Sequence, residues 1–250
     1  MRNVIPHDIR VGCAGWSIPK EHAAEFSKDG SHLERYAHRL PAVEINSSFY
    51  RPHRPSTYAR WAAETPEGFA FAVKVPKEVT HTRRLVDVED SLGRFLDETA
   101  ALEVKRGPLL VQLPPSLRFQ EEIVDAFFSG LRRHYSGLVV CEPRHRSWFS
   151  GEGDRLLRGY QIARVAADPA VVPLAAEPGG WDGLIYHRLH GSPEMYHSPY
   201  MSDDLDSVAK RLVEAASSCW CIFDNTALGA ATANALALMQ RLPGMGRPPG

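Results

Sequence analysis

Residues 69–75 read FAFAVKV, and their alternation indicates a strand with two different faces. Successive side chains point to opposite faces of a strand. One face of this run carries only phenylalanine and valine, whereas the other carries two alanines followed by Lys74. Large apolar side chains suit the layer between a sheet and its covering helices. We therefore expect Lys74 to point into the interior of a closed sheet, near the C-terminal end of its strand.

Seven further runs are short, rich in Val, Ile, Leu or Phe, and typical of strands buried on both faces. They are residues 9–15, 42–46, 108–113, 138–142, 164–168, 184–190 and 219–225. Helical patterns separate them at 31–40, 56–65, 90–106, 120–135, 150–160, 202–217 and 227–240. Eight strands alternating with helices in 250 residues predict a (β/α)₈ barrel with a parallel closed sheet. A two-domain doubly wound fold is the alternative, but it needs a linker, and no Gly/Ser-rich linker is evident.

We predict one domain over residues 1–240 and a flexible tail over 241–250. Residues 169–183 contain three prolines and a Gly-Gly pair, which indicates an irregular connection in place of a helix between strands six and seven.

The bulk composition favours a soluble cytoplasmic protein. The net charge is -1, so a polyanionic partner would have to meet a local basic patch. No run approaches the length of a membrane span, and the first residues lack the apolar core of a secretory signal. The four cysteines lie in or beside apolar runs and form no CxxC pair, which favours buried thiols in a reducing compartment.

Polar side chains recur at the C-terminal ends of the predicted strands. In a barrel this face carries the chemistry, because strands hold side chains rigidly and the following loops close over them. The alternation of side chains sends inward Glu44, Asn46, Lys74, Gln112, Glu142, Asp168, Tyr186, Arg188 and His190, and either Asp224 or Asn225. The alternative is purely structural: Glu44 with Lys74, and Glu142 with Arg188, would be ion pairs that neutralise each other.

The loops after strands two, three, five and seven are basic and aromatic. They read SSFYRPHRP, PKEVTHTRR, PRHRSWF and GSPEMYHSPY. Gathered at one end of a barrel, they would suit an anionic ligand with flat rings, namely a nucleotide, a nucleic acid strand or a phosphorylated metabolite. The alternative is a solvated basic rim with aromatic side chains packed beneath the loops.

Common cofactor and nucleophile motifs are absent from the sequence. There is no GxGxxG, GxxxxGK[ST], HExxH or GxSxG. A divalent metal could be held by the set Glu142, Asp168, His190 and Asp224. Because Lys74, Arg144 and Arg188 would crowd the same mouth and repel a cation, we expect no cofactor and no tightly bound metal.

Several strings in order resemble the YecE-like family, known as domain-of-unknown-function family 72. They are GWS (15–17), VEINSSFYRP (43–52), RWAAETPEGFAFAVKVPKEVTH (60–81), GPLLVQLPPS (107–116), CEPRHRSWF (141–149), YHRLHG (186–191) and FDNT (223–226). The resemblance covers roughly residues 8–240 and implies a TIM barrel without implying a reaction. The residues in its hallmark strings are Trp16, Glu44, Asn46, Phe49, Tyr50, Lys74, His81, Gln112, Glu142, Arg144, Trp148, Arg188, His190, Asp224 and Asn225. The chain departs from the pattern at Cys13, Ala14 and Ile18.

Three functions remain open at this point. The leading hypothesis is an enzyme, a hydrolase or lyase, acting on an anionic substrate. The anion would be held by Lys74, Arg144 and Arg188. Protons would be transferred by Glu142 and His190, with Asp168 as a further catalytic candidate. The walls of the pocket would be Trp148 and Phe149. The second hypothesis is a metal-assisted phosphoesterase or nuclease, by analogy of fold alone. The third is a non-catalytic module that binds nucleic acid or another ligand.

Overall fold

The structure, a computed structural model, describes residues 8–243. Its single sheet runs in the order β7-β9-β10-β1-β2-β3-β4-β5-β6-β8. The strands are β1 (Ile9–Ala14), β2 (Ala42–Ile45), β3 (Ala70–Lys74), β4 (Arg106–Gln112), β5 (Val139–Glu142), β6 (Ala163–Arg164), β7 (Ala166–Asp168), β8 (Gly179–Gly180), β9 (Ile185–Leu189) and β10 (Cys219–Phe223). Each of the eight predicted runs contributes to this sheet.

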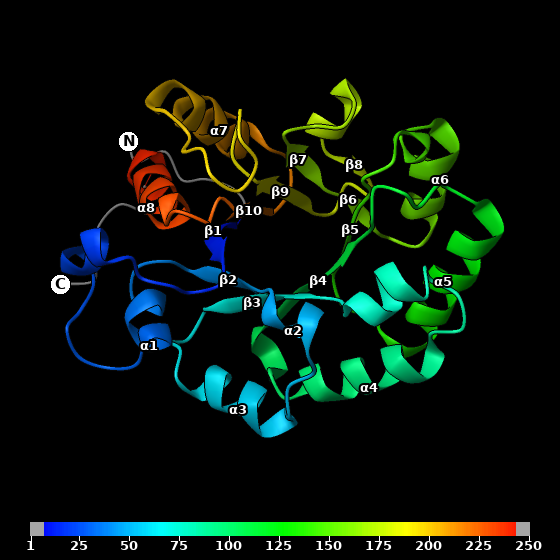
Figure 1. Ribbon diagram of the computed structural model, residues 1–250, viewed down its shortest axis with the longest axis horizontal. Coiled ribbons are helices and arrows are strands. Elements are labelled where there is room, and N and C mark those ends of the chain that lie inside the picture. The colour runs from blue at the N-terminus through cyan, green and yellow to red at the C-terminus, as the bar shows by residue number, and fades with distance from the viewer. Residues whose placement is uncertain (1–7, 244–250) are drawn as a thin grey trace.

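The sixth predicted strand is divided, and its two halves bring the ends of the sheet together. β6 pairs with β5 through Val140 and Ala163, whereas β7 pairs with β9 through Ala166 and His187. Only Val165 separates the two halves, so one short run joins both ends of the sheet into a nearly closed barrel (Figure 1). All pairings are parallel except that of β8, which lies antiparallel to β6. The predicted barrel class is confirmed.

Helices cover the outside of this sheet, as Figure 1 shows for α3 and α4 below it, α5 and α6 to its right, and α7 and α8 above it and to its left. They are α1 (His32–Ala37), α2 (Ser47–Tyr50), α3 (Pro55–Ala63), α4 (Glu89–Ala100), α5 (Glu121–His134), α6 (Gly151–Gly159), α7 (Ser202–Glu214) and α8 (Ala230–Arg241). The helix predicted over 90–106 was too long. It ends at Ala100, and strand β4 begins at Arg106 after a 3-10 turn.

The apolar residues form two separate cores. The larger lies between strands and helices and includes Phe71 and Val73 from the FAFAVKV run. The smaller fills the barrel interior, and its buried members are Ala42, Ala70, Ala72, Leu110, Val140, Ala163, Val165, Ala167, Leu184, Tyr186, Trp220 and Ile222. The predicted faces of β3 are therefore confirmed. Small residues on one side leave room for the rings of Tyr186 and Trp220, which stack with centroids 6.0 Å apart.

Gly107 shows how tightly this interior is packed. A Cβ atom at this position would lie 2.7 Å from the Trp220 ring, well inside van der Waals contact. Strand β4 therefore needs a glycine at this position, because a larger residue would collide with the Trp220 ring.

The connection between strands six and seven is irregular, as predicted. It contains only a 3-10 turn (Pro173–Ala176) and the two-residue strand β8. At the other end, α8 continues to Arg241 and Leu242 is buried, so the predicted tail begins too early. Residues 244–250 of that tail lie outside the described residues. Over residues 8–243, no helix has the length and apolar character needed to cross a membrane.

Candidate active site

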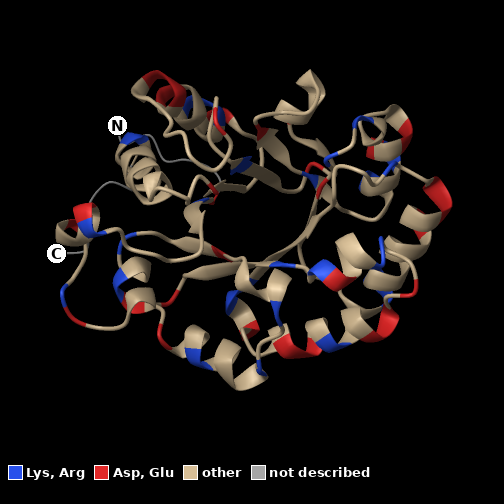
Figure 2. Ribbon diagram, viewed as in Figure 1, with Lys and Arg blue, Asp and Glu red and all other residues tan. Residues whose placement is uncertain are grey.

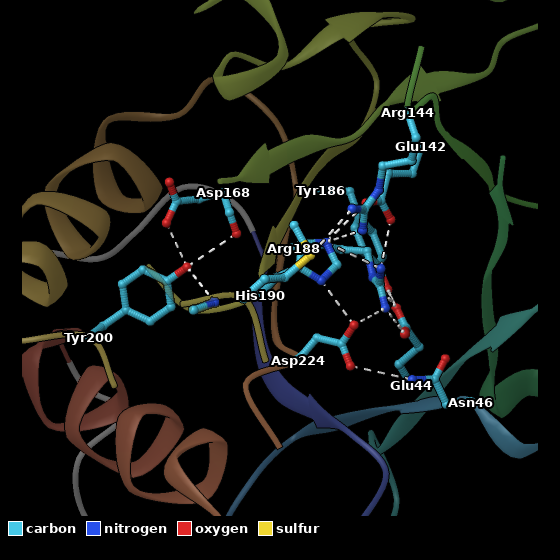
Figure 3. Close-up of polar contacts among 12 residues, drawn as sticks. Glu44, Asn46, Glu142, Arg144, Asp168, Tyr186, Arg188, His190, Tyr200 and Asp224 are labelled. Carbon is cyan, nitrogen blue, oxygen red and sulfur yellow. Dashed lines mark hydrogen bonds and ion pairs between the residues drawn. The ribbon is translucent and has the colours of Figure 1, made fainter. Parts of the chain in front are cut away.

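Arg188 lies at the centre of a charged cluster at the C-terminal ends of the strands (Figure 3). Its Nε and Nη2 donate to the two carboxylate oxygens of Glu44, at 3.0 and 2.6 Å. Nη1 donates to Glu142 at 2.7 Å, and Nη2 also donates to Asp224 at 3.0 Å. Tyr186 donates its hydroxyl hydrogen to Glu44 at 2.9 Å. All three guanidinium nitrogens are thus occupied by carboxylates of this chain.

Glu142, His190 and Asp224 form a continuous chain of proton-binding groups. His190 Nδ1 lies 3.0 Å from Asp224 Oδ2, and Nε2 lies 3.0 Å from Glu142 Oε1. Burial alone would raise the pKa of Glu142, but Arg188, Arg144 and His190 outweigh it and hold that pKa well below its ordinary value. Burial likewise opposes ionisation of Asp224, and Arg188 again lowers the net pKa. Both carboxyl groups therefore stay ionised at neutral pH.

His190 is placed for either protonation state. As an imidazolium it would donate to the carboxylates on both sides. As a neutral ring with its hydrogen on Nδ1, it would accept at Nε2 from Arg144 Nη2, which lies 2.8 Å away. Arg144 Nη2 also lies 2.6 Å from Glu142 Oε1, so Arg144 satisfies Glu142 when His190 does not. The geometry suits transfer of a proton to and from His190.

The cluster has two layers that differ in access to water. We call Glu44, Glu142, Arg188 and His190 the charged floor, because each is 0% exposed. Above it lies a set with partial exposure, the upper ring, consisting of Asn46, Lys74, Gln112, Arg144 and Asp224. A ligand arriving from solvent would first meet the upper ring, at the ends of strands β2, β3, β4, β5 and β10.

Two polar atoms of the upper ring are buried without a hydrogen-bond partner: Asn46 Oδ1 and Arg144 Nε. Lys74 Nζ is not fully enclosed, but it also makes no hydrogen bond or ion pair with any residue in 8–243, and it lies 4.3 Å from the centre of the Phe49 ring. Buried polar groups are normally paired. These unsatisfied groups therefore indicate a place where water or a ligand binds.

The positive charge of the mouth is concentrated around His81. Partial burial lowers the pKa of this histidine, and Lys74, Lys77, Arg144 and Arg84 lower it further. Its ring packs edge-on against Phe49, with centroids 4.9 Å apart. His81 is therefore held neutral within a locally positive field, although the outer helices carry interspersed charges of both signs (Figure 2).

The loop after β9 covers the floor on one side. The Tyr196 ring packs edge-on against His190 with centroids 5.8 Å apart, and Met195 Sδ lies 3.9 Å from Arg144 Nη1. Neither residue was predicted as a site residue, although both lie in the loop string GSPEMYHSPY that follows the seventh predicted strand. Only their position just after the end of a predicted strand indicated that they could lie at the mouth.

Asp168 was predicted to point inward, and this was wrong. Val165 and Ala167 belong to the barrel interior, so Asp168 must face outward. Its carboxylate accepts a hydrogen bond from Tyr200 at 2.6 Å, apart from the Arg188 cluster (Figure 3). It lines a separate cavity of about 260 Å³ beside α7, together with His187. The missing helix between β7 and β9 explains why this part of the outer face is hollow.

Three other candidates lie away from the cluster. Trp148 is completely buried and donates its Nε1 hydrogen to Leu117 O at 2.9 Å, so the predicted pocket wall is wrong. Phe149 packs instead against the guanidinium of Arg164. Asn225 donates to Ser198 O and to Asn234 Oδ1, which are structural contacts.

Two aromatic candidates lie at the edge of the mouth. Trp16 packs edge-on against Trp61, with centroids 5.0 Å apart. Tyr50 is 78% exposed and contacts Phe49. The other predicted binding residues fall into two groups. Those in direct contact with one another in the cluster are Glu44, Asn46, Arg144, Arg188 and Asp224. Those nearby are Lys74 and Gln112, at the ends of neighbouring strands, and His81, in the segment that follows β3.

The proposed metal ligands are not gathered in one place, because Asp168 faces away from Glu142, His190 and Asp224. Within residues 8–243 no group of three or more His, Cys, Asp or Glu side chains is arranged to hold a metal ion. The absence of a cofactor stays a prediction. All four cysteines are free and buried.

Similarity to known sequences agrees with this fold. A stretch of 173 residues is 30% identical to the UPF0759 protein YecE of Escherichia coli strain K12, covering 67% of this chain and 61% of that protein. A stretch of 153 residues is 30% identical to the UPF0759 protein YunF of Bacillus subtilis strain 168, covering 57% of this chain and 52% of that protein. The matches therefore span less than two thirds of either relative.

Solved structures share the architecture. A DUF72 family protein from Thermotoga maritima MSB8 superposes with a TM-score of 0.77 at 24% identity, covering 94% of this chain and 98% of that one. A DUF72 family protein from Enterococcus faecalis V583 gives a TM-score of 0.77 at 23% identity, covering 94% and 95%. The family model described as "Protein of unknown function DUF72" matches residues 10–248. The chain therefore belongs to the DUF72 family.

Proposed function

We propose that this protein is an enzyme that acts on a small anionic substrate at the C-terminal mouth of the barrel. The proposal rests on one observation, the difference in pairing between the two layers of polar side chains at the mouth. A dry, fully paired charged floor lies beneath an upper ring whose Arg144 Nε, Asn46 Oδ1 and Lys74 Nζ lack protein partners. A barrel that needed only stability could fill this volume with apolar side chains, as it does lower in the same interior.

Arg144 and Lys74 would hold the anion in this proposal. Arg144 keeps Nε free, and its side chain is 10% exposed, whereas Arg188 is completely enclosed. Arg188 would therefore act as the structural centre of the floor, contrary to the role that the sequence suggested for it. The neutral ring of His81, placed among four cations, adds a hydrogen-bonding group without opposing charge.

Proton transfer would run through Asp224 and His190. Asp224 is 7% exposed, and it connects the upper ring to His190, which Glu142 supports from the other side. A histidine between two ionised carboxylates can accept a proton and return it, while Arg144 Nη2 redirects its hydrogen bond between His190 and Glu142.

The first test is anion binding by titration calorimetry with inorganic phosphate and with sulfate. Replacing Arg144 by Gln removes a charged donor, and a hydrogen bond to a charged group contributes roughly 1.5–3 kcal/mol, so affinity should fall about ten- to a hundredfold. Arg54→Gln is the matched control, because Arg54 is exposed on the rim and should change affinity by less than about threefold. Equal affinities for the two variants, in proteins of unchanged melting temperature, would remove Arg144 from the site.

A further inference from the structure

Lys74 differs from the other charged groups at the mouth. Its side chain extends from the last residue of β3, is 7% exposed, and has no ion-pair partner among residues 8–243, although Glu44, Asp224 and Glu142 are near enough to affect it. Every one of those carboxylates is already bound by Arg188. The amine therefore lies in a polar site without a counter-ion of its own.

The apolar neighbour of Lys74 is the ring of Phe49, 4.3 Å away. Ser48, which precedes it in α2, donates its hydroxyl hydrogen to the backbone carbonyl of Lys74 at 2.7 Å, so α2 is fixed to this strand end. The amine is thus positioned by the strand and by α2, and it is not drawn into an ion pair that would keep it occupied.

The environment also increases the fraction of Lys74 that is a neutral amine. Burial, followed by the nearby charge of Arg188, lowers the pKa of Lys74 to about 8, and the carboxylates only partly oppose this. At neutral pH about one molecule in ten would carry a free amine, against fewer than about one in a thousand for an unperturbed lysine. The charged or titratable groups facing Lys74 are Glu44 on β2, His81 after β3, Glu142 on β5, Arg188 on β9 and Asp224 after β10.

We propose that Lys74 is a covalent nucleophile that forms an imine with the carbonyl carbon of an anionic aldehyde or ketone. This inference rests on the proposed function and refines it: Arg144 would hold the anionic group of the substrate, and Lys74 would attack the carbonyl carbon of that substrate in place of binding its charge. Desolvated lysines beside another cation are suited to this chemistry. The substrate class is thereby narrowed to small carbonyl compounds bearing a carboxylate or a phosphate.

The bonds and atoms of the step balance without a co-reactant. The lone pair of the neutral amine attacks the carbonyl carbon, and the C=O double bond opens to a hydroxyl in a carbinolamine. The C–O bond then breaks, and a C=N double bond replaces it. The two hydrogens of the amine leave with the carbonyl oxygen as water. Asp224 and His190 lie in the same cluster and can relay these protons between nitrogen and oxygen.

Reductive trapping tests the inference on the full chain. The protein is incubated with sodium cyanoborohydride and one of two anionic probes, pyruvate or dihydroxyacetone phosphate, at neutral pH. Acetone and dihydroxyacetone are the matched neutral probes. Peptide mapping by mass spectrometry then locates any lysine whose mass rises by that of the probe less one oxygen atom.

We expect at least tenfold faster labelling of Lys74 than of Lys77, the exposed lysine three residues later, with at least one anionic probe. Lys74→Arg keeps the positive charge and should abolish labelling at this position, and Lys77→Met should leave Lys74 labelling unchanged. A melting temperature for each variant, with Lys74→Met as a neutral replacement beside the charged Lys74→Arg, excludes unfolding as the cause. The two anionic probes distinguish a carboxylate-bearing substrate from a phosphate-bearing one.

The outcomes separate this inference from the proposed function. Labelling of Lys74 that falls tenfold or more in Arg144→Gln supports both. If labelling of Lys74 is equal for anionic and neutral probes and is unchanged in Arg144→Gln, the imine is supported and the anion site is overturned. No preferential labelling of Lys74 by any of the four probes overturns the imine, even if phosphate still binds through Arg144.

Discussion

The two halves of the barrel interior are filled by opposite kinds of side chain. The lower half is filled by alanines, leucines and two stacked rings, whereas the upper half is filled by carboxylates, guanidinium groups and an imidazole. Both halves are nearly closed to water. Burial alone therefore does not select apolar residues. In the charged half, each charged side chain needs its ion-pair partner, so a single substitution leaves another charge buried and unpaired. A substitution in the apolar half leaves no unpaired charge.

The largest effect should come from the centre of the charged half. Arg188→Met leaves Glu44, Glu142 and Asp224 buried with much of their compensation removed, and breaking a buried ion pair in this way costs about 3–5 kcal/mol. Urea unfolding followed by circular dichroism would measure the loss. Arg54→Met, an exposed replacement of the same kind, should change stability by less than about 0.5 kcal/mol. Equal stability of the two variants would show that the floor does not depend on Arg188.

The apolar half should lose stability without losing function. Leu184→Ala removes a buried side chain from the inner core and should cost about 3 kcal/mol through lost burial and the cavity it leaves. Because Leu184 precedes β9, four residues before Arg188 and at the opposite end of the strand from the mouth, phosphate affinity should stay within about twofold of the unchanged protein. A tenfold loss of affinity in the folded variant would show that the two halves are coupled.

His187 provides a third case, in which a titratable side chain is buried without an ionic partner in the part of the chain described. It lies outside the barrel near Arg211, and burial lowers its pKa to about 4. In the unfolded chain an ordinary histidine takes up a proton near pH 6.5, so the contribution of the neutral ring to stability is present above that pH and is lost as pH falls towards 4.

The corresponding measurement is unfolding free energy against pH for the unchanged protein and for His187→Gln. The unchanged protein should lose roughly 2–3 kcal/mol more than the variant between pH 6.5 and 4. Parallel curves would show that His187 is protonated or hydrated in the folded protein. The ion-paired carboxylates should begin to matter only at lower pH, because Arg188 holds the pKa of Glu142 well below its ordinary range.

The smallest expected effect has the opposite sign. Lys74→Met should raise stability by about 1–2 kcal/mol at pH 7, because it removes an amine whose protonated form is penalised by burial. The unchanged protein should become more stable as pH rises from about 8 towards 10.5, where the unfolded chain still binds the proton and the folded chain does not. The variant should lack this slope. A loss of stability in Lys74→Met would mean that the lysine balances the carboxylates of the floor.

The parts of the site that could be predicted from sequence are those where the two faces of a strand differ in size. In FAFAVKV the contrast between phenylalanine and alanine fixes the direction of Lys74. The run RVAAD offers little such contrast, and Asp168 was accordingly assigned to the wrong face. Strand eight was ambiguous between Asp224 and Asn225, and packing of Trp220 and Ile222 into the interior decides for Asp224.

Other features depend on contacts between distant segments. Arg188 was correctly placed inside, but its saturation by three carboxylates from β2, β5 and the end of β10 follows from barrel closure. Trp148 was assigned to the mouth because it follows a strand end closely. A 3-10 turn instead directs its ring to Leu117 beneath the neighbouring loop, a contact 31 residues away in sequence.

The rigidity of the charged floor has a consequence for the energetics of any reaction above it. Water that solvates a changing charge must reorient, and that reorientation adds to the activation barrier. The groups of the floor are 0% exposed and held by hydrogen bonds on several sides, so their dipoles are already fixed before a substrate arrives. A preorganised environment of this kind has a small reorganisation energy, and it stabilises a developing charge without first having to respond to it.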